Sequence, residues 1–326
     1  MGLIENTKTY KGQDLETIFF RPIFAGENAE QLGIRTLYNM PTPTTIHMWS
    51  PSTEILDEYD TGWSGGSASV RQQKTIELFK VKAETSFTSA DYFHQVYENI
   101  IGRANVNLGD LTGTELEQAE TEMFRRAIAE SVRVTMWIGD VEATRYNRFN
   151  GFLTLIMKYT SMSPNMNVVD CRDLPVSPDN VIEVLQRTWT AAPPALKALK
   201  SEGNLAYFVT TDIYDAYEQY LDQFGADSTY IDVMTGRREL MYHGIKIVDM
   251  GISQFLHMRS NKPQTYCILT DRRNLVLAVN TADYPGSEVR MWYNPDEMEN
   301  RQRAVFMVGC EVLDEQLLVV ADYTNA

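Results

Sequence analysis

Residues 114–140, TELEQAETEMFRRAIAESVRVTMWIGD, form the stretch that decides the fold of this chain. Thr114 followed by Glu117 is a capping box, which satisfies free backbone amides at the start of a helix. Beyond Val132 nearly every residue is apolar, and a Gly-Asp pair ends the pattern after Ile138. The apolar residues before that point recur at three- and four-residue steps, which places them on one helical face: Leu116, Met123, Phe124, Ala127, Ile128, Ser131 and Val132. The sequence therefore predicts a long helix that is solvated at its start and enclosed at its end, around which the chain is organised.

The composition is that of a globular protein with a sizeable core. With 326 residues and 44% hydrophobic content, the chain is long enough for one large domain or two to three smaller ones. No apolar run approaches the ~20 residues that span a bilayer, and the first residues lack the layout of a signal peptide, so we expect no membrane association and no export. The formal net charge of -15 opposes binding to phosphates, so we expect any relation to DNA to be indirect or confined to a local basic patch.

The chain has three cysteines, Cys171, Cys267 and Cys310. They are widely spaced and odd in number, which is typical of reduced thiols rather than of a disulfide framework.

Two segments precede the long helix and its short neighbour at 89–101. Residues 1–39 are polar and weakly periodic but contain Phe19 and Phe20, and such an aromatic pair favours an extended arm that packs against another surface over a frayed terminus. Residues 40–88 contain two extended segments around a Gly- and Ser-rich turn with Trp63, which predicts a long β-hairpin. Its strands carry too few large apolar residues to be stable alone, so the hairpin must lie on another surface of its own or a neighbouring subunit.

The remainder mixes helices and strands. RYNRFNGFL turns into an apolar strand or short helix, residues 160–176 read as a loop, and Ser177-Pro178-Asp179 begins a helix that runs to about Trp189. NLAYFVT is a buried strand that leads into a helix, IYDAYEQYLDQFG, capped by Thr211 or Asp212. The chain then continues mostly as strands and closes with a strand, an acidic turn and a return strand in RAVFMVGCEVLDEQLLVVADY.

No constellation of residues indicates catalysis, a cofactor or a metal. The four histidines are dispersed, and none has another His or Cys within four residues. The Gly-Gly at 65–66 is better explained as a hairpin tip than as a phosphate-binding loop, and Tyr214, Tyr217 and Tyr220 share a helical spacing that favours packing over base stacking. The least implausible acid–base group is Asp91, His94 and Glu98 on one helical face. We therefore expect a self-assembling structural protein rather than an enzyme.

Taken in this order, the elements resemble the major capsid proteins of tailed bacteriophages, whose fold is shared by encapsulin shells and herpesvirus capsid floors. The resemblance rests on the arm, the long hairpin, the helix ending in TMWIGD, RYNRFNGFL, NLAYFVTTDIYDAYEQYL, LMYHGIKIVDM and the closing RAVFMVGCEVLDEQLLVVADY. It spans nearly the whole chain and depends on order and spacing.

The resemblance implies an α+β fold with four parts. These are an N-terminal arm at 1–39, an extended hairpin loop at 40–88, a peripheral domain formed by 89–176 and 286–326 with the long helix as its spine, and an axial domain at 177–285. The hairpin loop would reach over a neighbouring subunit, and axial domains would meet around pentamer and hexamer axes. The acidic first turns of the spine helix would point toward a subunit boundary.

The same resemblance implies partners and contact residues. The partners would be further copies of the chain, portal and scaffolding proteins, and in some cases decoration proteins, with packaged double-stranded DNA contacted only indirectly, in a virion assembled in the cytoplasm of a bacterial host. The expected inter-subunit contacts are Phe19, Phe20, Trp49, Trp63, Lys74, Phe79, Glu117 and Glu122. Some family members join a loop lysine to a neighbour's asparagine, but no local motif here matches that asparagine or the assisting glutamate. The alternatives are an encapsulin-type compartment and, less favoured, an α/β enzyme.

Overall fold

The computed structural model describes residues 8–10, 32–40, 43–50, 70–88, 115–163, 166–223, 230–231, 238–259, 262–280 and 288–323. Phe19, Phe20 and Trp63, the short helix expected at 89–101 and the candidate group Asp91, His94 and Glu98 lie outside these residues. Within them the chain is a mixture of helices and sheets, which confirms the α+β class.

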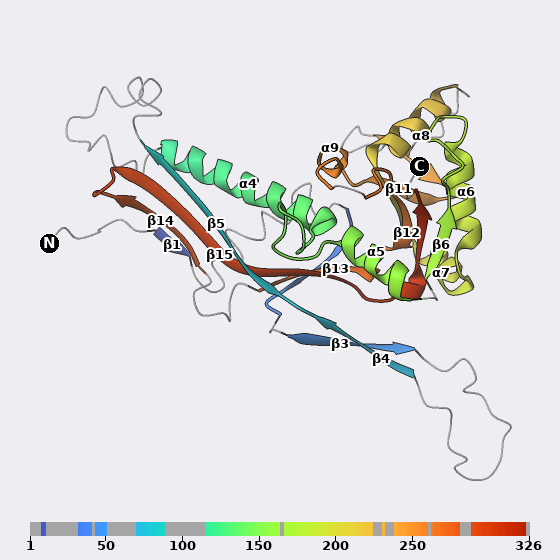
Figure 1. The fold of residues 1–326 in the computed structure, drawn as a ribbon, viewed down its shortest axis with the longest axis horizontal. Coiled ribbons are helices and arrows are strands. Elements are labelled where there is room, and N and C mark those ends of the chain that lie inside the picture. The colour runs from blue at the N-terminus through green and yellow to red at the C-terminus, as the bar shows by residue number, and fades with distance from the viewer. Residues whose placement is uncertain are drawn as a thin grey trace, which may run out of the picture.

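The first sheet is long and mostly antiparallel. Its strands run in the order β1-β14-β15-β13-β2, and β5 pairs with β15 off this path. Their bounds are Lys8–Tyr10 for β1, Arg35–Tyr38 for β2, Phe79–Thr88 for β5, Leu275–Asn280 for β13, Glu288–Asn294 for β14 and Glu299–Val312 for β15. β15 is the central strand, because it pairs with β13, β14 and β5 along different parts of its length. The spine helix α4 (Glu115–Ile138) lies alongside β5 and β15 (Figure 1).

The second sheet is buried on both faces. Its order is β10-β11-β7-β12-β16-β6, with bounds Met241–Tyr242, Ile245–Asp249, Leu205–Val209, Cys267–Asp271, Leu318–Asp322 and Asn167–Asp170. All five side chains of β7 are buried, and Ala206 and Phe208 face a different cluster from Leu205, Tyr207 and Val209. A strand covered on both faces reads as a continuous apolar run, which explains the sequence LAYFV.

Helices cover the outer face of the second sheet. They are α6 (Val181–Ala191), α7 (Pro194–Ala198) and α8 (Thr211–Gln223), and α6 and α8 lie side by side at one end of the molecule (Figure 1). Three short elements join their neighbours here: η2 (Leu199–Glu202) leads from α7 into β7, α9 (Ser253–Leu256) lies between β11 and β12, and η3 (Arg272–Asn274) leads from β12 into β13 of the first sheet. β8 (Tyr230–Ile231) pairs with β9 (Arg238–Glu239).

The end of the spine helix is enclosed, as its sequence predicts. Trp137 is fully buried and packs against Phe152 of α5 (Phe152–Met162) with ring centroids 5.4 Å apart, and against Phe208 of β7 at 5.5 Å. The same core includes Phe306 of β15. The last turns of α4 therefore pack between the two sheets, rather than only under the sheet formed by the last strands.

Two glycines allow the chain to turn back after the spine helix. The amide of Gly151 donates to the carbonyl of Gly139 at 2.9 Å, and Gly139 donates to Thr135 at 2.8 Å. A Cβ on either glycine would lie 2.5 Å from the carbonyl oxygen of Thr135. Only glycine permits this close approach of backbone to backbone. The segment RYNRFNGFL leads into a helix, α5, rather than into a strand.

The hairpin expected at 40–88 is shorter than its sequence suggests. β3 (Thr44–Ser50) and β4 (Val70–Ile76) pair as a two-stranded ribbon. The following strand β5 does not continue the ribbon but pairs with ten residues of β15 in the same chain. Alternation of polar and apolar residues is the same in both segments, so local sequence could not separate the ribbon from the sheet strand.

Four other expectations need correction. Residues 160–176 are not a loop, because α5 continues to Met162 and β6 lies at the edge of the second sheet. The helix expected at 177 begins at Val181, after a turn in which the Ser177 carbonyl accepts the Val181 amide at 3.0 Å. Thr211 is the first residue of α8 rather than its cap, and its hydroxyl donates to Asp249 at 3.1 Å.

The fourth correction concerns the return strand at the C-terminal end. β16 does not pair with β15, because η4 (Glu315–Leu317) redirects the chain into the second sheet, where β16 pairs with β12 and β6. β13, conversely, lies in the first sheet. β12 and β13, from the expected axial domain, thus pair with β16 and β15 from the expected peripheral domain, while the division into the two domains stays a prediction.

Candidate functional site

Lys74 is the expected contact residue that the structure describes most fully. Its ammonium lies 2.9 Å from Glu315 Oε1 in η4 and 3.8 Å from Glu311 Oε1 at the end of β15. It also lies 4.2 Å above the ring of Tyr159 in α5, a cation–π contact. Lys74 therefore attaches the ribbon to its own subunit, whereas the sequence predicts that this side chain contacts a neighbouring subunit.

Glu311 and Tyr159 form the buried half of this group. The Tyr159 hydroxyl donates to Glu311 Oε1 at 2.5 Å, and the amide of Val312 donates to the same oxygen at 3.0 Å. Burial raises the pKa of Glu311, although the Tyr159 hydrogen bond and the Lys74 charge act in the opposite direction. Burial and the bond to Glu311 raise the pKa of Tyr159. Nothing in the local sequence marks these two residues, which come from elements 152 positions apart.

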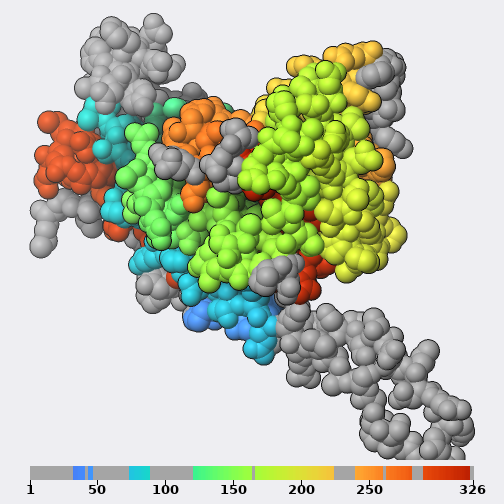
Figure 2. Space-filling model, turned by 45° about the vertical axis from the view of Figure 1, so that its right-hand side comes forward, coloured from blue at the N-terminus to red at the C-terminus, as the bar shows by residue number. Residues whose placement is uncertain are grey.

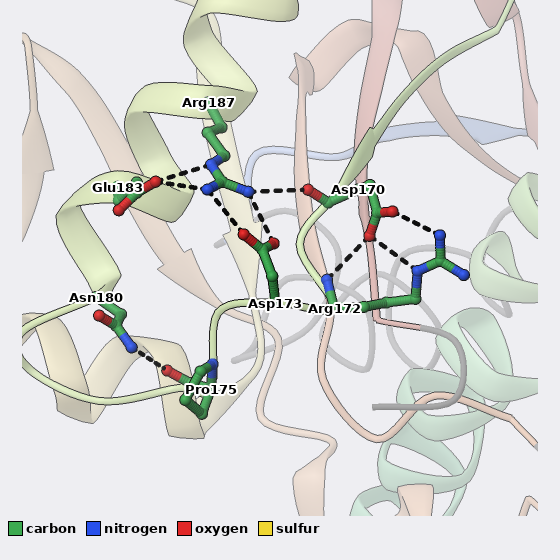
Figure 3. Close-up of polar contacts among 7 residues, drawn as sticks. All are labelled: Asp170, Arg172, Asp173, Pro175, Asn180, Glu183 and Arg187. Carbon is green, nitrogen blue, oxygen red and sulfur yellow. Dashed lines mark hydrogen bonds and ion pairs between the residues drawn. The ribbon is translucent and has the colours of Figure 1, made fainter.

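A second polar group lies at the free edge of the second sheet (Figure 3). Arg187 of α6 donates to both carboxylate oxygens of Asp173, at 2.8 and 2.9 Å, and to Glu183 Oε1 at 2.6 Å. Arg187 also reaches the carbonyl of Asp170 at 3.3 Å, while the Asp170 carboxylate pairs with Arg172. These bonds hold the pKa of Asp170 and of Asp173 below the usual range. A shallow hollow of about 720 Å³ lies beside Arg187, between α6 and Tyr220 of α8.

The remaining expected contact residues divide into two groups. Phe79 packs partly buried against the core of its own subunit, and Glu122 lies exposed on α4, where it pairs with Arg125 at 3.2 Å and Arg126 at 3.3 Å. Trp49 lies in β3 and Glu117 in α4, and the structure describes only their backbone.

The three tyrosines of α8 pack on the core of the second sheet, with Tyr217 buried.

The outer face of the first sheet carries a group of cations that sequence reasoning missed. Strand register places Arg303 opposite Arg290 and Glu84, and Arg301 opposite Trp292 and Ser86, all on the face away from α4. The cations on this face, hereafter the cationic face, are Lys80, Lys82, Arg290, Arg301 and Arg303. Lys82 and Arg303 contact the carboxylate of Glu84, and Arg301 contacts those of Glu297 and Glu299. A period of two in β5 and β15 could have revealed the group only if the pairing of these distant strands had been known.

The described part of the chain shows no cluster of three His, Cys, Asp or Glu side chains arranged to hold a metal ion. Cys171, Cys267 and Cys310 are free and buried. No helix among the residues that the structure describes has the length and apolar character needed to cross a membrane.

Comparison with known proteins assigns the fold. No family model and no curated protein matches the sequence. Solved structures do match over most of the chain. A chain of the satellite phage P4 procapsid that includes size determination (Sid) protein matches with a TM-score of 0.54 at 10% identity, over 93% of this chain and 89% of that one.

Two further structures agree with this match. A capsid chain of the empty GTA particle has a TM-score of 0.55 at 12% identity, over 91% of this chain and 89% of that one. The holo-SrpI encapsulin complex from Synechococcus elongatus has a TM-score of 0.50 at 12% identity, over 91% and 87%. The chain therefore has the major capsid fold of tailed bacteriophages, which the encapsulin shares.

Proposed function

We propose that this chain is a major capsid protein that assembles with copies of itself, as pentamers and hexamers, into a closed shell around double-stranded DNA. The observation that carries the proposal is the fold, which matches shell-forming proteins along about nine-tenths of its length. The β3–β4 ribbon supports it, because the ribbon extends away from both sheets (Figure 1). Two strands alone are marginally stable in water, and a neighbouring subunit would supply the missing surface.

The proposal includes the organisation that the sequence suggested. Residues 1–39 would be an arm, 40–88 an extended loop, 89–176 with 286–326 a peripheral domain, and 177–285 an axial domain that meets its copies around the symmetry axes. The protein would be structural rather than enzymatic. It would assemble in a bacterial cytoplasm with portal and scaffolding proteins, and in some shells with decoration proteins, and would form part of the virion.

If the chain forms a shell, the purified protein should contain assembled particles. Expression of the chain with a scaffolding protein, followed by size-exclusion chromatography and negative-stain microscopy, should give closed shells, whereas a stable monomer with no tendency to assemble would refute the proposal. Head-to-tail contacts must close into rings, since otherwise they extend as filaments. Several interfaces per subunit, each burying ~1,600 Å² in a standard case, would together stabilise a shell.

An encapsulin-type compartment is the second candidate, because an encapsulin chain shares the fold over most of this chain. The contents of purified particles distinguish the two. Nuclease-protected double-stranded DNA would support a virus capsid, and a stoichiometric protein cargo without DNA would support a compartment.

Charge suggests where the ribbon of a neighbour docks. Between β3 and β4 the sequence contains Glu54, Asp57, Glu58 and Asp60, and residues 51–69 contain no lysine or arginine. The cationic face is the matching surface on the first sheet, and Figure 1 shows that the ribbon points away from the turn between β14 and β15 of its own chain. A contact between the acidic tip and this face would thus join two copies.

Charge exchange tests this contact. The pair Glu54→Lys and Glu58→Lys should impair shell formation, as should Lys82→Glu with Arg303→Glu. Combining all four changes should restore assembly in part, because opposite charges face each other again. Failure of the combined variant to improve on either pair, with each chain folded by circular dichroism, would exclude this contact and leave the shell assignment untouched.

A further inference from the structure

The ribbon is attached to the body by few apolar contacts. Ile76, at the end of β4, is 1% exposed and packs with Leu78 against Val276, Ala278 and Met307. Beyond Ile76 toward the tip, Gln73 and Thr75 are exposed. On β3, Ile46 packs partly buried against the same cluster, directly across from Lys74. The buried anchor of β4 itself ends at Ile76, so the direction in which β4 continues toward the tip depends on further contacts.

The backbone at this anchor is held tightly. Glu77 passes over Gly309 of β15, where a Cβ would overlap the carbonyl oxygen of Glu77. On the opposite side of the entry, the Asn280 side chain donates to the carbonyl of Met40 at 2.7 Å. Both strands of the ribbon are thus fixed where they enter the body, and a change of direction has to occur beyond that point.

Lys74 supplies the second attachment, two residues farther along β4. Its ammonium contacts three elements at once: η4 through Glu315, β15 through Glu311 and α5 through Tyr159. The space-filling view shows the blue and cyan base of the ribbon against the green surface of the body (Figure 2). Ile76 and Lys74 thus hold β4 at two positions along its length, and two fixed positions set the direction of the strand.

The partners of Lys74 are themselves held in place. Glu311 accepts hydrogen bonds from Tyr159 and from the Val312 amide. The loop that carries Glu315 is fixed by Asn274, whose side-chain oxygen accepts the Asp314 amide at 2.7 Å and whose amide group donates to the Asp314 carbonyl at 2.8 Å. A preorganised acceptor costs little ordering entropy when the ammonium binds.

From this geometry we infer that Lys74 is a positioning residue, which fixes the direction in which the β3–β4 ribbon leaves the subunit. Tyr159, Glu311 and Glu315 form its receptor on the body. The inference depends on contacts within one chain and holds whether or not the chain forms a shell.

A distance measurement within one chain tests the inference. Ser50→Cys, at the far end of β3, and Thr190→Cys, exposed on α6, introduce two sites for spin labels. The three native cysteines are buried and should remain unlabelled. Labelled chains diluted with unlabelled ones, measured by double electron–electron resonance, then report the angle of the ribbon even in an assembled particle.

Lys74→Met removes the charge and keeps most of the aliphatic side chain. It should produce roughly a tenfold larger population at distances outside the main peak, the change expected from the loss of one hydrogen bond to a charged group. Lys74→Arg should restore the narrow distribution, because arginine also pairs with carboxylates and aromatic rings. Lys246→Met is the matched control, since Lys246 lies on β11 and pairs with Glu239, so this variant also loses one lysine ion pair.

A distribution for Lys74→Met that equals the parent's would overturn the inference, as would equal broadening by Lys246→Met. If Lys74→Met did not fold, Glu315→Gln would serve in its place, because Glu315 is the nearer carboxylate and lies at the surface of η4. Broadening by Glu315→Gln would support the role of Lys74, and an unchanged distribution would refute it.

Discussion

The amide of Gly151 donates to the carbonyl of Gly139 across 2.9 Å, which joins the end of the spine helix to the start of α5. Neither glycine is among those with positive φ, so the requirement for glycine is one of space. A methyl group on Gly151 would lie 2.5 Å from the Thr135 oxygen and 2.7 Å from the Trp137 oxygen.

Gly151→Ala should therefore destabilise the fold by about 2–4 kcal/mol, because the backbone of a packed core has to shift. The free energy of unfolding from urea titration measures it. Gly203→Ala is the control: Gly203 has a φ of 73° and no neighbour within 4 Å, so only about 1 kcal/mol of backbone strain is expected. Equal costs at the two positions would show that the close approach is unimportant.

Charge reversal at Glu122 should affect assembly more than folding. The side chain is exposed and, among the residues that the structure describes, pairs with Arg125 and Arg126 on its own helix, so Glu122→Lys should cost about 0.5 kcal/mol or less per lost pair. Sedimentation should show fewer shells. Adding Arg126→Glu restores a local ion pair, and shells that return to normal with it would mean that Glu122 acts within its helix and not at a subunit boundary.

As the pH falls, the free energy of unfolding of the parent chain should rise relative to that of the Glu311→Gln variant. Its pKa is raised in the folded state, so the folded protein binds this proton more tightly than the unfolded chain. The contribution is fully present below the unfolded pKa and is lost as the pH rises through the folded pKa. Urea unfolding of both chains at several values between pH 4 and 7 measures the difference, and a difference that does not change with pH would contradict the prediction.

The ion pairs around Arg187 should have the opposite pH dependence. The pKa of Asp173 is lowered by its hydrogen bond from Arg187, so its stabilisation is present above the unfolded pKa and is lost as the pH falls through the folded pKa. Arg187→Met should lower the melting temperature at pH 7 and have a smaller effect near pH 3. Arg172→Met, which leaves the Asp173 pair intact, is the control for loss of one positive charge.

The three cysteines should resist alkylation in the folded protein. Burial raises the pKa of Cys171 to about 11 and that of Cys267 to about 12, and it raises the pKa of Cys310 as well. The reactive thiolate is therefore scarce and enclosed. Mass spectrometry after iodoacetamide treatment at pH 8 should find all three unmodified, and modified only after denaturation. Rapid reaction of any one would show that it is exposed.

Elements with a local sequence signal could be predicted without the structure. The spine helix was recognised from its period and its terminal Gly-Asp, and β7 from five consecutive apolar residues. The order of such elements was sufficient for the resemblance to capsid proteins, and the structural matches confirm the fold. These features depend on residues within one or two turns of each other, so no knowledge of distant partners was needed.

Only the tertiary structure decided which strands pair and where charges meet. The local pattern predicts β5 as part of the ribbon, but β5 pairs with β15 more than 200 residues away. It likewise predicts β16 as the return partner of β15, but β16 enters the second sheet. For Lys74 the sequence predicts a contact with a neighbouring subunit, which stays a prediction, and the structure adds an ion pair with Glu315 of the same chain. Pairing and ion contacts between distant segments depend on loop closure and on burial by the whole fold, and a local pattern of polar and apolar residues carries no record of either.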